Sequence, residues 1–175
     1  PLIDEKQHTL LLEKVTIPIW VDGDLIRLSQ IFSNIINNAA KYTPSGGTIE
    51  VLITTVGGKV TITVKDNGEG IPTDKLETVF DMFSQVEGGL ERSQGGLGIG
   101  LTLVKRLTEM HDGSVNVYSD GVGKGTKLEV TLPVSNNVSS SPSKSQKVEH
   151  IPEAPSEKLN VLIADDNQDA AITMG

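Results

Sequence analysis

The sequence predicts an α+β domain, a two-layer α/β sandwich in which a mixed, mostly antiparallel sheet of about five strands packs on about three helices. Segments that alternate apolar and polar residues are joined by short glycine turns, as in hairpins. Helical patterns stand apart from these hairpins, which argues against a doubly wound parallel sheet. Aromatic residues make up only 3% of the chain, so the core must consist mainly of Val, Ile and Leu.

The long helix is the most clearly predicted element. Residues 8–13 and 15–20, ahead of it, are rich in β-formers and are expected to be strands. Over residues 24–42, apolar side chains recur at helical spacing, namely Leu28, Ile31, Ile35 and Ala39. The pattern ends at residues 43–47, where one proline and two glycines form a strong helix breaker.

A hairpin, a short helix and a loop are expected next. Residues 48–56 and 59–66 alternate with period two, and the two residues between them, Gly57 and Gly58, suit a tight hairpin turn. A short helix is predicted over 72–80. The polar, glycine-rich stretch 84–97 is predicted to be a loop.

The end of the domain is predicted to be a helix followed by two strands. The helix runs over residues 98–110 and stops near Gly113. Strands are expected at 115–119 and 127–132, with the glycine-rich residues 121–125 between them.

Composition divides the chain into three parts. Residues 1–134 form the predicted domain. Residues 135–158 hold seven Ser and three Pro without periodicity, which is typical of a flexible linker. Residues 159–175 begin with an apolar strand that ends in Asp165 and Asp166. A segment of this length cannot bury a core of its own.

Charge and composition exclude several classes of function. The net charge of −8 gives no electrostatic footprint for nucleic acid. The absence of cysteine excludes disulfides and thiolate chemistry and is compatible with a reducing cytoplasm. No apolar run approaches the roughly 20 residues of a membrane helix. Because the chain begins at Pro1, we expect a cytoplasmic piece of a longer protein, without membrane contact of its own.

The polar face of the long helix is unusual. At helical spacing it carries Arg27, Gln30, Asn34, Asn37, Asn38 and Lys41. A solvated face is the plain alternative, but each asparagine costs about 0.5 kcal/mol relative to Glu or Lys at mid-helix. Amide oxygens are hard, neutral ligands that can hold Mg²⁺ and leave its charge for phosphate. This face is therefore predicted to be a metal and phosphate site.

A second candidate follows the strand at residues 59–66. Residues 66–68, Asp-Asn-Gly, would by themselves indicate only a turn. Their place at the end of an apolar strand, followed by Gly70 and Ile71, favours a binding role. The Asp66 carboxylate could accept an N–H of a base, and Gly68 and Gly70 would let the backbone approach that base.

The third candidate is the glycine-rich segment 95–101, which opens a helix. Helix N-termini bind anions through free N–H groups and the helix dipole. The segment lacks the Gly-Lys-Ser/Thr of a Walker A loop and the spacing of a dinucleotide fingerprint. We expect a movable lid over phosphates.

In this order the three segments resemble the N box and the two glycine boxes of the ATP-binding catalytic domain of sensor histidine kinases. The resemblance spans about residues 8–133 and places the domain in the superfamily of gyrase, Hsp90, histidine kinases and MutL, which has a Bergerat-type fold. It implies ATP and Mg²⁺ as cofactors. By resemblance, Asn38 is the direct Mg²⁺ ligand, Asn34 supports the metal or its waters, Lys41 meets phosphate and Tyr42 borders adenine.

The same resemblance assigns the remaining positions. Asp66 reads adenine, with Gly68, Gly70 and Ile71 beside the base and Thr126 assisting the carboxylate. The lid residues in contact with nucleotide are Gly96, Leu97, Gly98, Gly100 and Leu101. Phe80 and Phe83 resemble the family's F box; they either anchor the base of the lid in the core or dock on a partner helix. Arg92, by its place just ahead of the glycines, could reach the γ-phosphate. Asn34, Asn38, Lys41 and Arg92 are thus the candidate catalytic residues.

The resemblance implies a protein-histidine kinase module that presents the γ-phosphate to a histidine on a separate dimerisation domain. His8, His111 and His150 lack the acceptor context, so this chain alone is not expected to phosphorylate itself. The segment from residue 159 resembles the first strand of a receiver domain, which implies a hybrid kinase. A non-catalytic nucleotide-sensing module and an ATP-hydrolysing relative remain alternatives. Hydrolases of the superfamily carry a glutamate where this chain has Asn34, and an amide cannot accept a proton.

Overall fold

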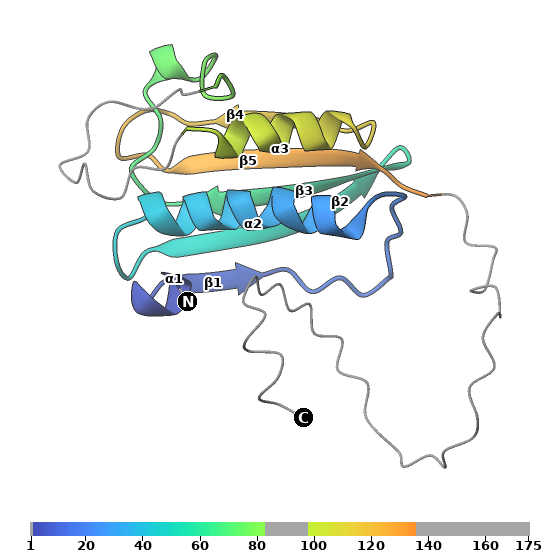
Figure 1. The fold of residues 1–175 in the computed structure, drawn as a ribbon. Coiled ribbons are helices and arrows are strands. Elements are labelled where there is room, and N and C mark those ends of the chain that lie inside the picture. The colour runs from blue at the N-terminus through green and yellow to red at the C-terminus, as the bar shows by residue number, and fades with distance from the viewer. Residues whose placement is uncertain (1, 83–97, 136–175) are drawn as a thin grey trace, which may run out of the picture. The chain divides into compact units, whose positions relative to one another are not determined.

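In the computed structural model, residues 2–82 and 98–135 are described, and they form a five-stranded mixed sheet with helices (Figure 1). The predicted fold class is therefore confirmed. The elements in chain order are helix α1 (Leu2–Glu5), strand β1 (Thr9–Leu12), helix α2 (Leu25–Tyr42), strands β2 (Thr48–Val56) and β3 (Lys59–Asp66), the 3₁₀ turn η1 (Thr73–Lys75), helix α3 (Gly100–Glu109), and strands β4 (Ser114–Tyr118) and β5 (Thr126–Pro133).

The sheet has the strand order β1-β2-β3-β5-β4. Only β1 and β2 are parallel, and the other three pairs are antiparallel. The predicted hairpin turn is present, with Val56 opposite Lys59 and both Gly57 and Gly58 at positive φ, which is the backbone of a type I′ turn. The register of β3 and β5 places Asp66 opposite Thr126.

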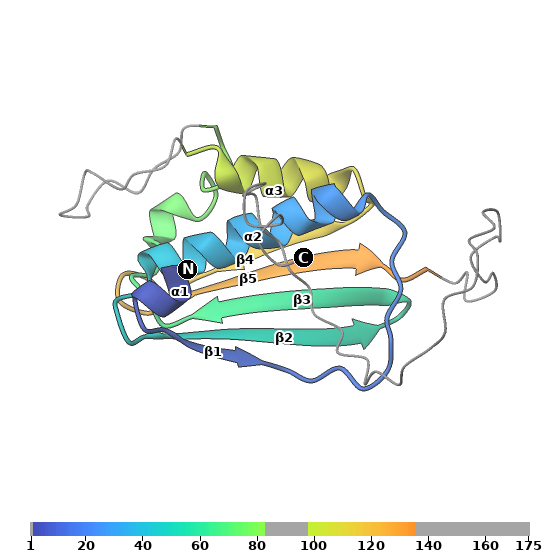
Figure 2. The same cartoon turned by 60° about the horizontal axis from the view of Figure 1, so that its bottom comes forward.

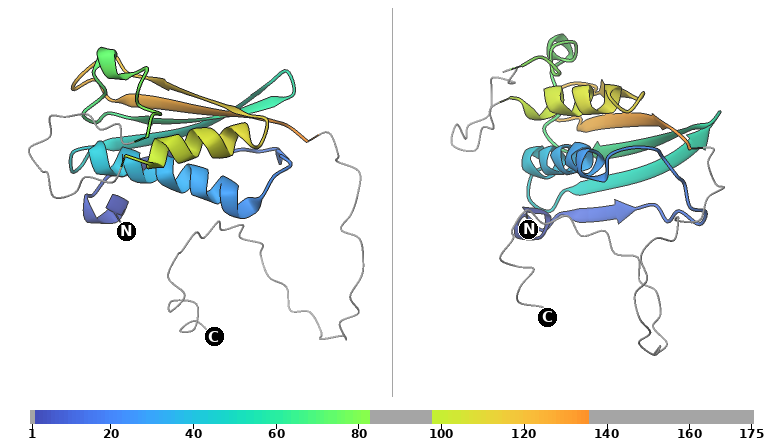
Figure 3. Two further views of the ribbon diagram at one scale, coloured as in Figure 1. Left: turned by 45° about the horizontal axis from the view of Figure 1, so that its top comes forward. Right: turned by 45° about the vertical axis from the view of Figure 1, so that its right-hand side comes forward.

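Helices α2 and α3 lie side by side on one face of the sheet (Figures 2 and 3). The deeply buried apolar residues of this layer include Ile31, Ile35, Ile49, Val104, Val130 and Leu132. They come from both helices and from β2 and β5, and all are aliphatic, as the composition predicts. Each fully buried aliphatic side chain contributes about 1.5–3 kcal/mol, so this layer fixes the height of both helices above the sheet.

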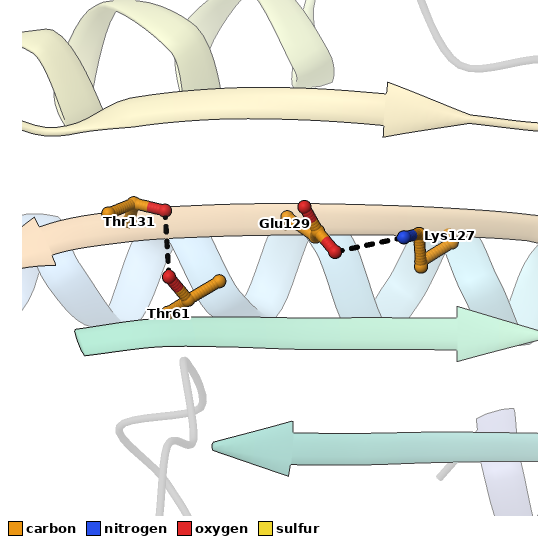
Figure 4. Close-up of polar contacts among 4 residues, drawn as sticks. All are labelled: Thr61, Lys127, Glu129 and Thr131. Atoms are coloured by element: carbon orange, nitrogen blue, oxygen red, sulfur yellow. Dashed lines mark hydrogen bonds and ion pairs between the residues drawn. The ribbon is translucent and has the colours of Figure 1, made fainter. Parts of the chain in front are cut away.

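The opposite face of the sheet carries polar side chains (Figure 4). The hydroxyls of Thr61 and Thr131 are hydrogen-bonded at 3.0 Å across β3 and β5. Lys127 forms a 3.0 Å ion pair with Glu129, and its ammonium lies 4.2 Å from the ring centroid of Tyr118. Antiparallel sheets commonly leave one face solvated in this way.

Helix α2 begins and ends where the sequence predicts. Asp24 is its N-cap, and its Oδ1 accepts from the N–H groups of Ile26 at 2.8 Å and Arg27 at 3.1 Å. At the other end the N–H of Thr43 donates to Ala39 O before the chain turns through Pro44. These bonds satisfy N–H and C=O groups that have no partner inside the helix.

The predicted strand over 15–20 is wrong. The Glu13 N–H donates to Val51 O, but the next free N–H of β2, that of Ile53, donates to the Glu13 carboxylate instead of to a backbone carbonyl. This side chain ends the pairing at the sheet edge, and Ile17 and Trp20 are left 74% and 61% exposed.

Two helical elements also differ from the expectation. Helix α1 is a single turn that was not predicted, because its four residues are too few for a periodic pattern. The helix expected over 72–80 is only the 3₁₀ turn η1 followed by turns. Its apolar residues Leu76, Val79 and Phe80 are only half-buried and do not pack against the core cluster, so no buried apolar face stabilises a longer helix.

No helix in the described parts of the chain is long and apolar enough to cross a membrane. The predicted loop at 84–97, the linker beyond residue 135 and the receiver-like segment 159–175 lie outside the described residues.

Candidate functional site

The turn after β3 holds the Asp66 carboxylate in a defined orientation. Its Oδ1 accepts from the N–H of Gly68 at 2.8 Å and from the N–H of Thr126 at 3.2 Å. Within the described residues, no donor is bonded to the second oxygen, Oδ2. Burial raises the pKa of the Asp66 carboxyl above its ordinary value of 3.8, although the two backbone N–H groups act in the opposite direction.

Two glycines let this turn pack against its neighbours. A Cβ at Gly68 would collide with the carbonyl oxygen of Tyr42, at the end of α2. A Cβ at Gly125 would collide with Asp66 O, and Gly125 also has a φ of +73°. Only glycine allows both the close approach to Asp66 O and the positive φ at position 125 without strain. The Asp66 turn is thus in direct backbone contact with both α2 and the start of β5.

Ser119, a residue that the sequence analysis missed, joins the Gly70–Ile71 segment to the β4–β5 connection. Its Oγ accepts from the N–H of Ile71 at 2.9 Å and donates to Gly125 O at 2.7 Å. Gly123 N–H also donates to Glu69 O at 2.6 Å. Position 119, the last residue of the strand predicted at 115–119 and close to the glycine-rich residues 121–125, was the available signal for this role.

The asparagine face of α2 meets the first turn of α3. A Cβ built at Gly100 would lie 3.8 Å from Asn38 Nδ2 and 4.0 Å from Asn34 Oδ1. Both asparagines are half-buried, whereas Asn37 is exposed. The N-cap residue of α3, Ile99, makes no side-chain cap, so in the described part of the chain the first N–H groups of α3 and the positive end of its dipole are available on this side.

The last turn of α2 connects the two halves of the site. The Lys41 ammonium lies 4.9 Å from the centroid of the Tyr42 ring, which is 48% exposed. The N–H of Glu69 donates to Tyr42 O at 3.0 Å. One and the same helix therefore carries the asparagine face beside α3 and, one turn later, contacts the Asp66 turn.

The structure thus brings together most of the predicted site residues. Asn34, Asn38, Lys41 and Tyr42 come from α2; Asp66 ends β3, and Gly68, Gly70 and Ile71 follow it; Gly98 precedes α3, which Gly100 and Leu101 open; Thr126 begins β5. Arg92, Gly96, Leu97 and Phe83 lie outside the described residues. Phe80 is half-buried beneath Lys105 of α3, whose ammonium lies 5.8 Å from the ring centroid.

The donor set available for a metal consists of amides. In the residues that the structure describes, no three His, Asp or Glu side chains form a cluster that could hold a metal ion. A divalent ion at the asparagine face would therefore be held by neutral oxygens, as the sequence predicts, and would rely on phosphate oxygens for charge.

Comparison with known proteins agrees with this arrangement. Residues 23–136 match the family described as histidine kinase-, DNA gyrase B- and HSP90-like ATPases. The chain belongs to this family. The resemblance drawn from the three sequence segments, to the ATP-binding catalytic domain of sensor histidine kinases, is confirmed.

Individual relatives of this ATPase domain are sensor kinases. The autoinducer 2 sensor kinase/phosphatase LuxQ of Vibrio parahaemolyticus is 36% identical over 182 residues, which cover 99% of this chain and 21% of LuxQ. The chain therefore spans about a fifth of such relatives. The mycobacterial sensor histidine kinase MprB aligns with a TM-score of 0.65 and 26% identity over 76% of this chain and 88% of its own. Full-length ShkA, crystallised with AMPPNP, aligns with a TM-score of 0.65 and 28% identity over 77% of this chain and 27% of its own.

Proposed function

We propose that this domain binds Mg·ATP between the Asp66 turn and the asparagine face of α2, and presents the γ-phosphate to a histidine on a separate dimerisation domain. One observation carries the proposal. Asp66 Oδ1 is occupied by two backbone N–H groups, so Oδ2 is left to accept the exocyclic amino group of adenine. A half-buried acceptor held in this way discriminates against a base that lacks the donor.

The C-terminal half of α2 and the start of α3 offer groups suited to a triphosphate. The free N–H groups of α3 and the ammonium of Lys41 favour negative charge. Asn38 would ligate Mg²⁺ and Asn34 would hold the ion or its waters, with Gly98, Gly100 and Leu101 beside the phosphates. Mg²⁺, when bound, neutralises phosphate charge. The residues of this chain position the nucleotide.

Transfer to a protein is favoured over hydrolysis. The amide of Asn34 cannot accept a proton from water near neutral pH, whereas phosphoryl transfer requires mainly positioning and charge neutralisation. The described histidines are engaged in the fold: His8 Nε2 is 2.9 Å from Ala40 O, and both ring nitrogens of His111 are hydrogen-bonded. The acceptor histidine is therefore expected on another domain.

The chain is proposed to come from a hybrid kinase in a two-component system. LuxQ, a sensor kinase, aligns over 99% of this chain, including the segment from residue 159. We propose that residues 1–134 are the catalytic module, 135–158 a linker and 159–175 the start of a receiver domain.

Nucleotide titration with and without Mg²⁺ tests the proposal. Asp66→Ala should weaken the binding of all adenine nucleotides, and Asn38→Ala should mainly remove the Mg²⁺ dependence of nucleotide binding. Failure of the unaltered domain to bind ATP would overturn the proposal. Label transfer from γ-labelled ATP to added dimerisation helices separates a kinase from a nucleotide-sensing module. Steady-state ATP turnover by the domain alone would instead support a hydrolase.

A further inference from the structure

The C-terminal end of α2 is held by two side chains from the segment that precedes β1. Lys6 Nζ donates to Lys41 O at 2.7 Å. His8 Nε2 lies 2.9 Å from Ala40 O, and because a carbonyl oxygen can only accept, this nitrogen carries the proton. His8 is 9% exposed. The preceding segment is thus connected to α2 by one buried and one charged hydrogen bond.

These two contacts complete the hydrogen bonding of the helix end. The last four carbonyls of a helix have no partner inside it. In α2, Ala39 O accepts from the Thr43 N–H and Tyr42 O accepts from the Glu69 N–H. Ala40 O and Lys41 O accept from His8 and Lys6. Half of the carbonyls at this end therefore depend on the preceding segment.

The backbone of that segment is itself fixed. Gln7, between the two donors, has a φ of +56°, a conformation that non-glycine residues rarely adopt. Gly46 N–H donates to Lys6 O at 2.9 Å, and Thr9 N–H donates to Gly47 O at 2.8 Å. The turn at Gln7 directs both neighbouring side chains at α2, while the backbone bonds hold the segment against the loop that follows α2.

We infer that Lys6 and His8 are positioning residues for nucleotide binding. Their hydrogen bonds go to backbone carbonyls of α2 and hold the turn that carries Lys41 and Tyr42, two residues of the proposed site. The inference rests on the proposed function. Loss of either donor leaves a helix carbonyl without its partner and loosens this turn where the two halves of the site meet.

The other end of α2 offers a matched control. His111 Nδ1 lies 2.7 Å from Leu107 O, so it donates, and its Nε2 accepts from the Asp24 N–H at 3.1 Å. His111 thus holds the N-terminal end of the same helix. No predicted nucleotide-binding residue lies in the first turn of α2. His111→Ala should therefore lower stability without altering the site.

The test measures Mg·ATP affinity for His8→Ala, His8→Gln, Lys6→Met and His111→Ala, at a temperature where circular dichroism shows all of them folded. His8→Ala and Lys6→Met should each bind about three- to tenfold more weakly, the range expected for one hydrogen bond. His8→Gln keeps an N–H donor and should restore most of the affinity. His111→Ala should bind like the unaltered domain.

Two results would overturn the inference while leaving the proposed function in place. One is a His8→Ala domain that binds Mg·ATP as tightly as the unaltered domain. The other is a His111→Ala domain that loses as much affinity as His8→Ala, because nucleotide binding would then follow general stability. If the unaltered domain does not bind Mg·ATP, the proposed function itself fails, and the two failures are thereby distinguished.

Discussion

Replacing the Asp66 carboxylate by an amide tests two things together: whether Asp66 Oδ2 accepts from the adenine amino group, and how the buried charge affects the stability of the unliganded domain. In Asp66→Asn, the N–H groups of Gly68 and Thr126, which lie 2.8 and 3.2 Å from Oδ1 in the native domain, still require an acceptor. The amide oxygen should take that place, so the amide nitrogen replaces Oδ2. A donor would then face the amino group of adenine, which is also a donor.

The expected loss of affinity follows from the energy of a hydrogen bond to a charged group. Such a bond contributes about 1.5–3 kcal/mol. At 25 °C this corresponds to about 10- to 150-fold weaker Mg·ATP binding for Asp66→Asn. A purine with an oxygen at C6 offers an acceptor to the new donor. The relative preference for GTP over ATP should therefore rise.

The substitution should weaken Mg·ATP binding without lowering the stability of the unliganded domain. Burial raises the folded-state pKa of Asp66 above 3.8, so the folded state binds a proton more tightly than the unfolded chain does. The contribution of this carboxyl to the free energy of unfolding therefore falls as pH rises from 3.8 through the raised folded pKa. Asparagine does not ionise. At neutral pH, Asp66→Asn should melt no lower than the native domain.

Calorimetry measures both quantities. Isothermal titration with Mg·ATP and Mg·GTP gives the affinities, and differential scanning of the unliganded proteins gives the melting temperatures. Unchanged ATP affinity in Asp66→Asn would refute the assignment of Oδ2 to the base. A large fall in the melting temperature would show that the carboxylate is needed for the fold, and would refute the argument from burial.

Two further predictions concern positions that hold the site and the helix. Gly125→Ala should lower both the melting temperature and the Mg·ATP affinity, because alanine would collide with Asp66 O and is strained by about 1–2 kcal/mol at positive φ; a stable variant with native affinity would contradict the packing described. Asp24→Ala removes the N-cap of α2 and should cost about 1 kcal/mol in urea unfolding, and it should leave Mg·ATP affinity unchanged at the far end of the helix.

Elements with local signals were predicted well from the sequence. Gly57 and Gly58 define a two-residue turn by themselves, and the strands on either side alternate with period two. Helix α2 combines an apolar stripe at helical spacing with a breaker at Pro44. The pattern at 15–20 is just as rich in β-formers, but a strand also needs a partner. Strand β2 is the neighbour with which residues 15–20 would pair, but its next free N–H, that of Ile53, already donates to the Glu13 carboxylate.

The parts of the site that the sequence could not predict are held by contacts between distant residues. Ser119 bonds to the N–H of Ile71, 48 residues away, and His8 bonds to Ala40 O, 32 residues away. No spacing rule relates such positions, because their meeting depends on strand order and helix placement. Asp66 was predicted from its place at a strand end. The orientation of its carboxylate comes from the pairing of β3 with β5.

The decisive measurement is a crystal structure of the domain with Mg²⁺ and a non-hydrolysable ATP analogue. We expect the adenine amino group within hydrogen-bonding distance of Asp66 Oδ2, and the metal ion on the amide oxygen of Asn38, beside the first turn of α3. A nucleotide bound elsewhere, or a base that makes no contact with Asp66, would overturn the proposed site.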